Sequence, residues 1–132
     1  MSIATVRAAL GTALRTIPDL KVSDYITDEI TPPMAMFDLA VEPHLTFARG
    51  ADVYRYTVKC FVSRGSDAAG QKYLDLLRDP TTAGGLIQTI EENATLAAAV
   101  DYARVTGIGE VQIATVGGVE YLMIEALVEV VL

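Results

Sequence analysis

The sequence predicts an α+β domain in which a mostly antiparallel sheet is flanked by two to three helices. Near the start, apolar residues recur every three or four positions, which is the spacing of one helix face. From Tyr54 to Val62 they alternate with polar residues instead, which is typical of a half-buried strand. Strand-like residues continue from 102 to 132 across Gly117-Gly118, a hairpin signal. A chain of 132 residues suits one domain covering 1–132.

The first helix is expected to begin after Ser2, a good N-terminal cap, and to run to Ile17, because Pro18 ends it. Gly11 lies inside this helix. Close packing against another backbone and random sequence drift explain a glycine at this position equally well. A short strand is then predicted from Lys21 to Ile26.

The middle of the chain is expected to hold a long hairpin followed by two helices. Two consecutive prolines in 27–33 indicate a loop there, since proline excludes a central strand or helix. Cys60 falls in the alternating run and is expected to be a small core residue. Ser66 is expected to cap the second helix. The predicted elements are a strand over 35–41, a strand over 54–62, a helix over 67–78, a loop over 79–85 and a short helix over 86–92.

The segment from 102 onward is predicted to form two strands, with a bulge or bend at Gly107 and Gly109. The second strand stays apolar to Leu132, which indicates that it is held inside the sheet. A free edge this rich in Val and Leu would pair with other copies, so the strand needs either a covered place in the sheet or a neighbouring subunit.

The composition indicates self-association and argues against nucleic-acid binding. Hydrophobic residues make up 52% of the chain and charged residues 20%, so part of the apolar surface is expected to be covered by partners. A net charge of -7 is unsuited to binding the backbone phosphates of a nucleic acid. There is neither a targeting segment nor an apolar run long enough to span a bilayer, which predicts a chain that is cytosolic at synthesis.

Chemistry-bearing residues are few. His44 is the only histidine and Cys60 the only cysteine, so a metal site built from several such residues is excluded. His44 lies beside Pro43 without a catalytic motif around it, and a surface or interface role is expected. The basic residues Arg49, Arg55, Lys59 and Arg64 are expected to pair with the surplus carboxylates. No catalytic residue, cofactor or metal is therefore predicted.

The connection from Glu42 to Ala51 is the candidate interface. It is longer than the roughly two to five residues usual in a hairpin loop, and long loops often carry contacts. One interpretation is an arm that reaches a neighbouring subunit or a tail component. The other is an extended hairpin that folds back on its own domain. The residues in question are His44, Leu45, Phe47 and Arg49.

Taken in order, these elements resemble the tail terminator (tail completion) proteins of long-tailed bacteriophages. The likeness rests on the helix over 6–17, the strand that starts at Pro33-Met-Ala-Met-Phe37, the strand over 54–62, the helix over 67–78 and the closing segment 119–132. It implies a structural virion protein without catalytic residues, located at the tail–neck joint and in the host cytoplasm during assembly. The implied form is a hexameric ring that caps the tail tube and contacts the head–neck connector (stopper) protein, while DNA passes through its lumen without specific binding.

Two alternatives stay open. The nearer is another phage neck or minor tail component, although head-side adaptors tend to be helical and stoppers mostly β. The other is a small dimeric α+β ligand-binding domain or enzyme, which a pocket with convergent polar groups would favour.

Overall fold

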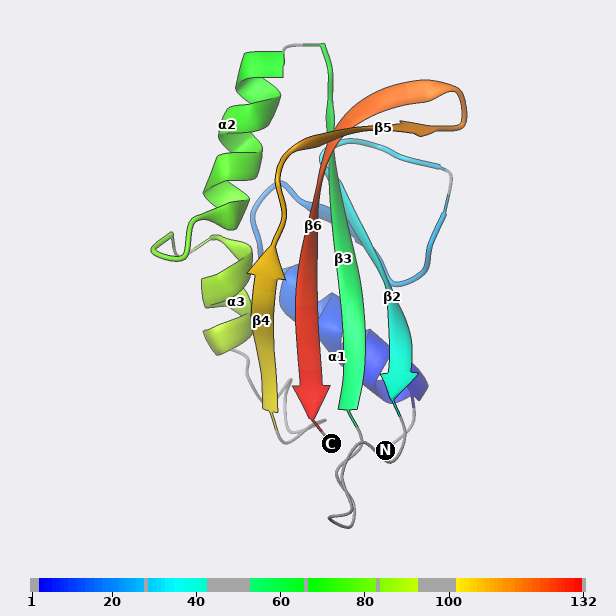
Figure 1. The fold of residues 1–132 in the computed structure, drawn as a ribbon, viewed down its shortest axis with the longest axis vertical. Helices are drawn as coiled ribbons and strands as arrows, with labels where there is room; N and C mark the ends of the chain where they lie inside the picture. Colours follow the sequence, from blue (N-terminus) through cyan, green and yellow to red (C-terminus); the bar gives the residue numbers. More distant parts are fainter. Residues whose placement is uncertain are drawn as a thin grey trace.

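The computed structural model describes residues 3–27, 29–42, 53–65, 67–82, 84–92 and 102–131. It confirms the predicted fold class, because three helices and a six-stranded, mostly antiparallel sheet form a single α+β domain in this part of the chain (Figure 1). The helices are α1 (Ile3–Leu14), α2 (Asp67–Arg78) and α3 (Leu86–Glu92). The strands are β1 (Lys21–Ser23), β2 (Met34–Glu42), β3 (Val53–Ser63), β4 (Tyr102–Ile108), β5 (Gln112–Val116) and β6 (Val119–Val131).

The long strand β6 lies inside the sheet. The strand order is β1-β2-β3-β6-β4, with β5 paired to β6 as well. Only β1 and β2 run parallel. Because β3 flanks β6 on one side and β4 and β5 flank it on the other, the apolar strand is covered by its own sheet. Of the two possibilities for this strand, the structure therefore shows the covered one, and β6 by itself does not require a partner subunit.

All three helices cover the same face of the sheet, and in Figure 1 α1 lies behind the strands. The main core forms between this face and the helices. Leu10 and Leu14 of α1, Leu74 of α2 and Ile90 of α3 are each buried against it. Cys60 is 0% exposed in this core, as its position in the alternating strand predicts.

A second, smaller core lies on the opposite face. The β5–β6 hairpin folds across one end of this face, so that Tyr121 and Met123 pack with Met36 and Phe61. Phe61 and Tyr121 meet edge to face with 6.0 Å between ring centroids. Below the hairpin this face carries no helix. We call the side chains of β2, β3, β4 and β6 on this uncovered part the open face.

Two elements are shorter than the sequence predicts. Helix α1 ends at Leu14, and the chain tightens to i→i−3 hydrogen bonds there, the N–H of Ile17 donating to the carbonyl of Leu14 at 3.1 Å. Strand β1 stops at Ser23 rather than Ile26. The next residue, Asp24, bonds to arginines of α1 and the following turn instead of extending the sheet, which explains the early end.

Gly11 packs closely, but against a side chain and not a backbone. A Cβ on Gly11 would lie 1.9 Å from Oδ1 of Asp24 and 3.0 Å from Nη1 of Arg15. Arg15 and Asp24 form an ion pair of 2.9 Å at this point. The glycine thus leaves room for the contact that ties the segment after β1 to α1.

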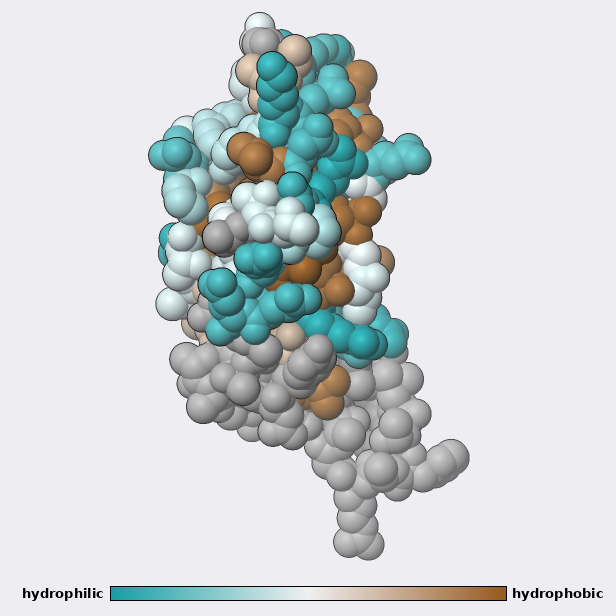
Figure 2. Space-filling view, turned by 90° about the vertical axis from the view of Figure 1, so that its left-hand side faces the viewer, coloured by the Kyte–Doolittle hydropathy of each residue, from teal (hydrophilic) through white to brown (hydrophobic). Residues whose placement is uncertain are grey.

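The exposed surface is not uniformly polar. From the side that lies on the left in Figure 1, hydrophobic residues show between hydrophilic ones over much of the described surface (Figure 2). Six large hydrophobic side chains of the described residues are at least half exposed: Tyr25, Ile26, Leu76, Ile113, Val119 and Leu127. This agrees with the high apolar fraction of the sequence. None of the helices described is long and apolar enough to cross a membrane.

Candidate functional site

The open face changes from apolar to charged along the strands. Cross-strand register places Phe61 opposite Met123 at the hairpin end, and Lys59 opposite Glu125 one step further. Because side chains alternate between the two faces, the next open-face pairs are Thr57–Leu127 and Arg55–Glu129. An open sheet surface with an apolar end and a charged end is suited to binding another protein surface.

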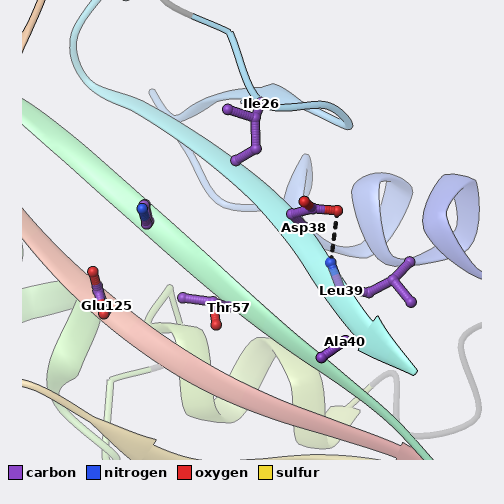
Figure 3. Close-up of a pocket in the computed structure, with 7 residues that line it drawn as sticks. Ile26, Asp38, Leu39, Ala40, Thr57 and Glu125 are labelled. Carbon is purple, nitrogen blue, oxygen red and sulfur yellow. Dashed lines mark hydrogen bonds between the residues drawn. The ribbon is translucent and has the colours of Figure 1, made fainter. Parts of the chain in front are cut away.

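Two adjoining hollows mark this face. One, of about 460 Å³, lies over β2, β3 and β6, and Asp38, Thr57 and Glu125 line it (Figure 3). The other, of about 470 Å³, continues toward the hairpin, where Phe61 and Val116 line it. Ile26 and Lys59 belong to both hollows. We call the two together the open-face groove.

The charges of the open face are balanced and largely paired. Glu129 lies between Arg55 and Arg104, with N–O distances of 3.5 and 3.3 Å. With Asp38, Lys59 and Glu125, the side chains of this face that the structure describes include three acidic and three basic ones. Since these pairs are solvent-exposed, each stabilises the fold little, and their main effect is to keep the face from being strongly charged.

Arg7 of α1 forms a polar clamp beside the groove. Its Nη1 donates to the carbonyl oxygens of Asp24 at 2.6 Å and Phe37 at 3.3 Å, and its Nη2 lies 3.0 Å from Oδ1 of Asp38. The guanidinium carbon also sits 4.8 Å from the centre of the Tyr25 ring, a cation–π contact. The side chain is only 13% exposed, so α1, the turn after β1 and the edge of β2 are held together at one point.

The clamp also closes part of the outer edge of β2. Strand β1 pairs with β2 only as far as Met36. Beyond Met36, the guanidinium of Arg7 donates a hydrogen bond to the carbonyl of Phe37. The N–H of Leu39 donates to the carboxylate of Asp38 at 2.8 Å, and Figure 3 shows this second bond. That backbone hydrogen bond, together with Arg7, lowers the pKa of Asp38. An edge whose backbone groups are already bonded is a poor template for pairing with another strand.

Cys60 and Tyr56 lie in the main core under the helices, not in the groove. Burial raises the pKa of the Cys60 thiol to about 12, so the thiol stays protonated under the helices and is no nucleophile. Burial likewise raises the pKa of Tyr56 to about 12. Within the described ranges, no group of three or more His, Cys, Asp or Glu side chains is placed to hold a metal ion.

The predicted interface residues His44, Leu45, Phe47 and Arg49 lie outside the described residues, so their role stays a prediction. Two predicted pairings of basic residues are confirmed. Arg55 pairs with Glu129, and Arg64 pairs with Asp67 at 2.9 Å and Glu120 at 2.7 Å. The Arg7 clamp was not predicted, because its partners lie 17 to 31 residues away in the sequence.

Comparison with known proteins adds no functional information. No protein-family model matches the chain, and no curated protein matches it significantly. Several solved structures are similar to the chain, and one of them has a TM-score of 0.43 and 22% sequence identity, covering 100% of this chain and 96% of that chain. A likeness at that level carries no argument about what the chain does.

Proposed function

We propose that this chain is a structural subunit of a phage tail terminator ring, six copies of which cap the tail tube and meet the head–neck connector. The order of elements supports this proposal through the family resemblance. The observation that carries it beyond the sequence is the one-sided sheet. Helices cover one face, while the other exposes Ile26 (53%) and Leu127 (50%) around the open-face groove. A subunit that functions by packing against copies and partners needs such a surface.

A dimeric ligand-binding domain is the second candidate, and the open-face groove is the observation that favours it. Its two hollows, of about 460 and 470 Å³, fall within the size range of small-molecule sites, roughly 300 to 1,000 Å³. The two candidates differ in copy number, since a ligand-binding domain of this kind would stop at a dimer.

The decisive experiment is a mass measurement of the purified chain, alone and with the tail-tube protein of the same phage, followed by negative-stain electron microscopy. We expect closed rings of six copies, in solution or on tube ends. A monomer or dimer under both conditions would reject the ring. Virion micrographs that place the chain away from the tail–neck joint would reject the terminator assignment even if rings form.

The chain is also expected to bind duplex DNA negligibly, as a conduit that lets DNA slide would require. The net charge is -7, and each of the six arginines that the structure describes lies within 4 Å of a carboxylate. Phosphates would therefore have to displace existing ion pairs while approaching an acidic protein. A fluorescence titration with labelled duplex near physiological salt checks this. Tight binding that weakens steeply with salt would favour a DNA-gripping neck component instead.

A further inference from the structure

The charged side chains of the open face form rows that follow the strands and alternate in sign. Across the strand order β2-β3-β6-β4, the rows are acidic, basic, acidic and basic. The residues in that order are Asp38, then Lys59 and Arg55, then Glu125 and Glu129, then Arg104. An even number of rows with alternating signs makes a surface that is complementary to a copy of itself.

One pair in the two middle rows has no ion-pair partner within the chain. Lys59 and Glu125 lie opposite each other in the register of β3 and β6, and both line the hollow that Figure 3 shows. Among the described residues neither forms an ion pair, whereas Asp38, Arg55 and Arg104 all do. The charges of Lys59 and Glu125 are therefore available to a second molecule.

A second copy satisfies these charges in one orientation. A two-fold axis that runs along the strands, midway between β3 and β6, places β3 of one copy over β6 of the other and β2 over β4. Since this axis shifts nothing along the strands, Lys59 faces Glu125 of the second copy, and Arg55 faces Glu129. The usual twist between stacked sheets, roughly 30°, leaves these central pairs within reach of each other. We propose that the open face binds the open face of a second copy in this orientation, so that the free chain is a two-fold dimer.

The other aligned way of stacking the two faces brings like charges together. A two-fold axis that runs across the strands places each strand over itself with its direction reversed, so β3 meets β3 and β6 meets β6. The basic row then faces a basic row, and the acidic row faces an acidic row. Like charges across an interface disfavour an arrangement, so the signs of the rows select the first axis.

Leu127 lies at the centre of the proposed contact. It is 50% exposed, is in register with Thr57, and sits between the levels of the two charge pairs. In the proposed orientation, the Leu127 side chains of the two copies lie on either side of the axis, each over Thr57 of the other copy. An apolar centre surrounded by charged and polar side chains is the usual layout of a specific interface.

The size of the open face indicates a reversible contact. Four strands that are uncovered from about Glu125 to Val131 measure roughly 19 by 24 Å at ordinary strand spacing. This is smaller than the about 800 Å² per partner of a standard stable interface, so we expect a dissociation constant in the micromolar range. The dimer itself follows from the open face alone. Its role as a cover that is given up when the ring forms rests on the proposed function.

A charge-swap variant tests contacts between copies separately from contacts within a chain. In Lys59→Glu/Glu125→Lys the cross-strand pair keeps opposite signs, and two copies of the variant still face each other with opposite charges. Its dissociation constant is expected to stay within about threefold of the wild-type value. In a dimer of wild type with variant, lysine faces lysine and glutamate faces glutamate, so mixed dimers are expected at least about tenfold below their statistical share. Native mass spectrometry of ¹⁵N-labelled wild type mixed with unlabelled variant counts the three dimers.

Asp75→Arg/Arg78→Asp is the matched control. It exchanges the charges of an ion pair on α2, on the other side of the sheet from the open face. Its mixture with wild type should give the statistical share of mixed dimers, about one half. The single variants Lys59→Glu and Glu125→Lys should each raise the dissociation constant at least about tenfold, because like charges then meet across the axis. Urea unfolding of every variant verifies that the domain is intact.

The failure of the dimer and the failure of the ring are distinguishable. Statistical mixing of wild type with the charge-swap variant, or a wild-type chain that stays monomeric up to about 100 μM, would overturn the dimer. Rings on tail-tube ends would then leave the proposed function standing. A monomer whose Lys59 is protected from amine labelling only by tail-tube protein would assign the open face to that partner instead. Selective dimers without rings on tube ends would uphold the dimer and overturn the proposed function.

Discussion

Replacing Gly85 by alanine is expected to destabilise the domain by about 2 to 3 kcal/mol. A Cβ at this position would lie 2.8 Å from the carbonyl oxygen of Asp79, 3.0 Å from that of Leu76 and 3.1 Å from that of Thr82. All three are backbone atoms, so no side-chain rotation relieves the clash. The turn before α3 must shift instead, and with it Leu86 and Ile90, which are buried in the main core.

Gly107→Ala is the matched control for this prediction. Gly107 lies at the irregularity of β4, and a Cβ there would meet nothing within 4 Å among the described atoms. The free energy of unfolding should therefore change by no more than about 0.5 kcal/mol. Urea unfolding followed by circular dichroism, at one fixed protomer concentration, measures both variants. Equal stabilities for the two would show that the turn before α3 adapts freely.

Replacing Arg7 by alanine is expected to cost about 2 to 4 kcal/mol. The change removes charge-assisted hydrogen bonds to two backbone carbonyls, of Asp24 and Phe37, from a side chain that is 13% exposed. It also removes the partner of Asp38 and the cation beneath the Tyr25 ring. Because the Phe37 carbonyl then lies unpaired on the outer edge of β2, we also expect more strand-to-strand association.

Arg104→Ala is the control for the clamp. Arg104 makes a 3.3 Å ion pair with Glu129, but its side chain is 53% exposed and Glu129 keeps Arg55 as a partner. Its loss should cost about 0 to 0.5 kcal/mol. Arg7→Lys should fall between the two, since lysine keeps the charge but lacks the planar fork that reaches several acceptors at once. If Arg7→Ala and Arg104→Ala unfold alike, the clamp contributes no more than an ordinary surface pair.

Much of the fold follows from local patterns in the sequence. Helix α2 was predicted over 67–78 and α3 over 86–92, which are their observed bounds, since cap, periodicity and breakers all lie within a few residues. The turn at Gly117-Gly118 was predictable for the same reason, and both glycines have positive φ, 60° and 79°. The early end of β1 was not predictable, because it depends on Asp24 meeting Arg7 of α1 and Arg15 of the turn after α1.

The surfaces were less predictable than the elements. Alternation along β3 predicts two faces, but it does not say that the hairpin folds across one end of the open face or that α2 covers the other. The open-face groove arises from such long-range placements, and it is built from at least three separate segments. The interface residues chosen from loop length, His44 to Arg49, lie outside the described residues and remain to be tested by mutation.

The place of β6 has a consequence for how the chain folds. Every other long strand precedes β6 in the sequence, yet β6 separates β3 from β4. While the polypeptide is being synthesised, the β2–β3 hairpin and β4 have no common neighbour, and one edge of each stays unpaired. Pairs such as Thr57–Leu127 join residues about seventy positions apart, and such distant contacts slow folding. The nascent chain is therefore most prone to aggregate just before β6 emerges, and its yield in the cell will depend on chaperones more than its small size would predict.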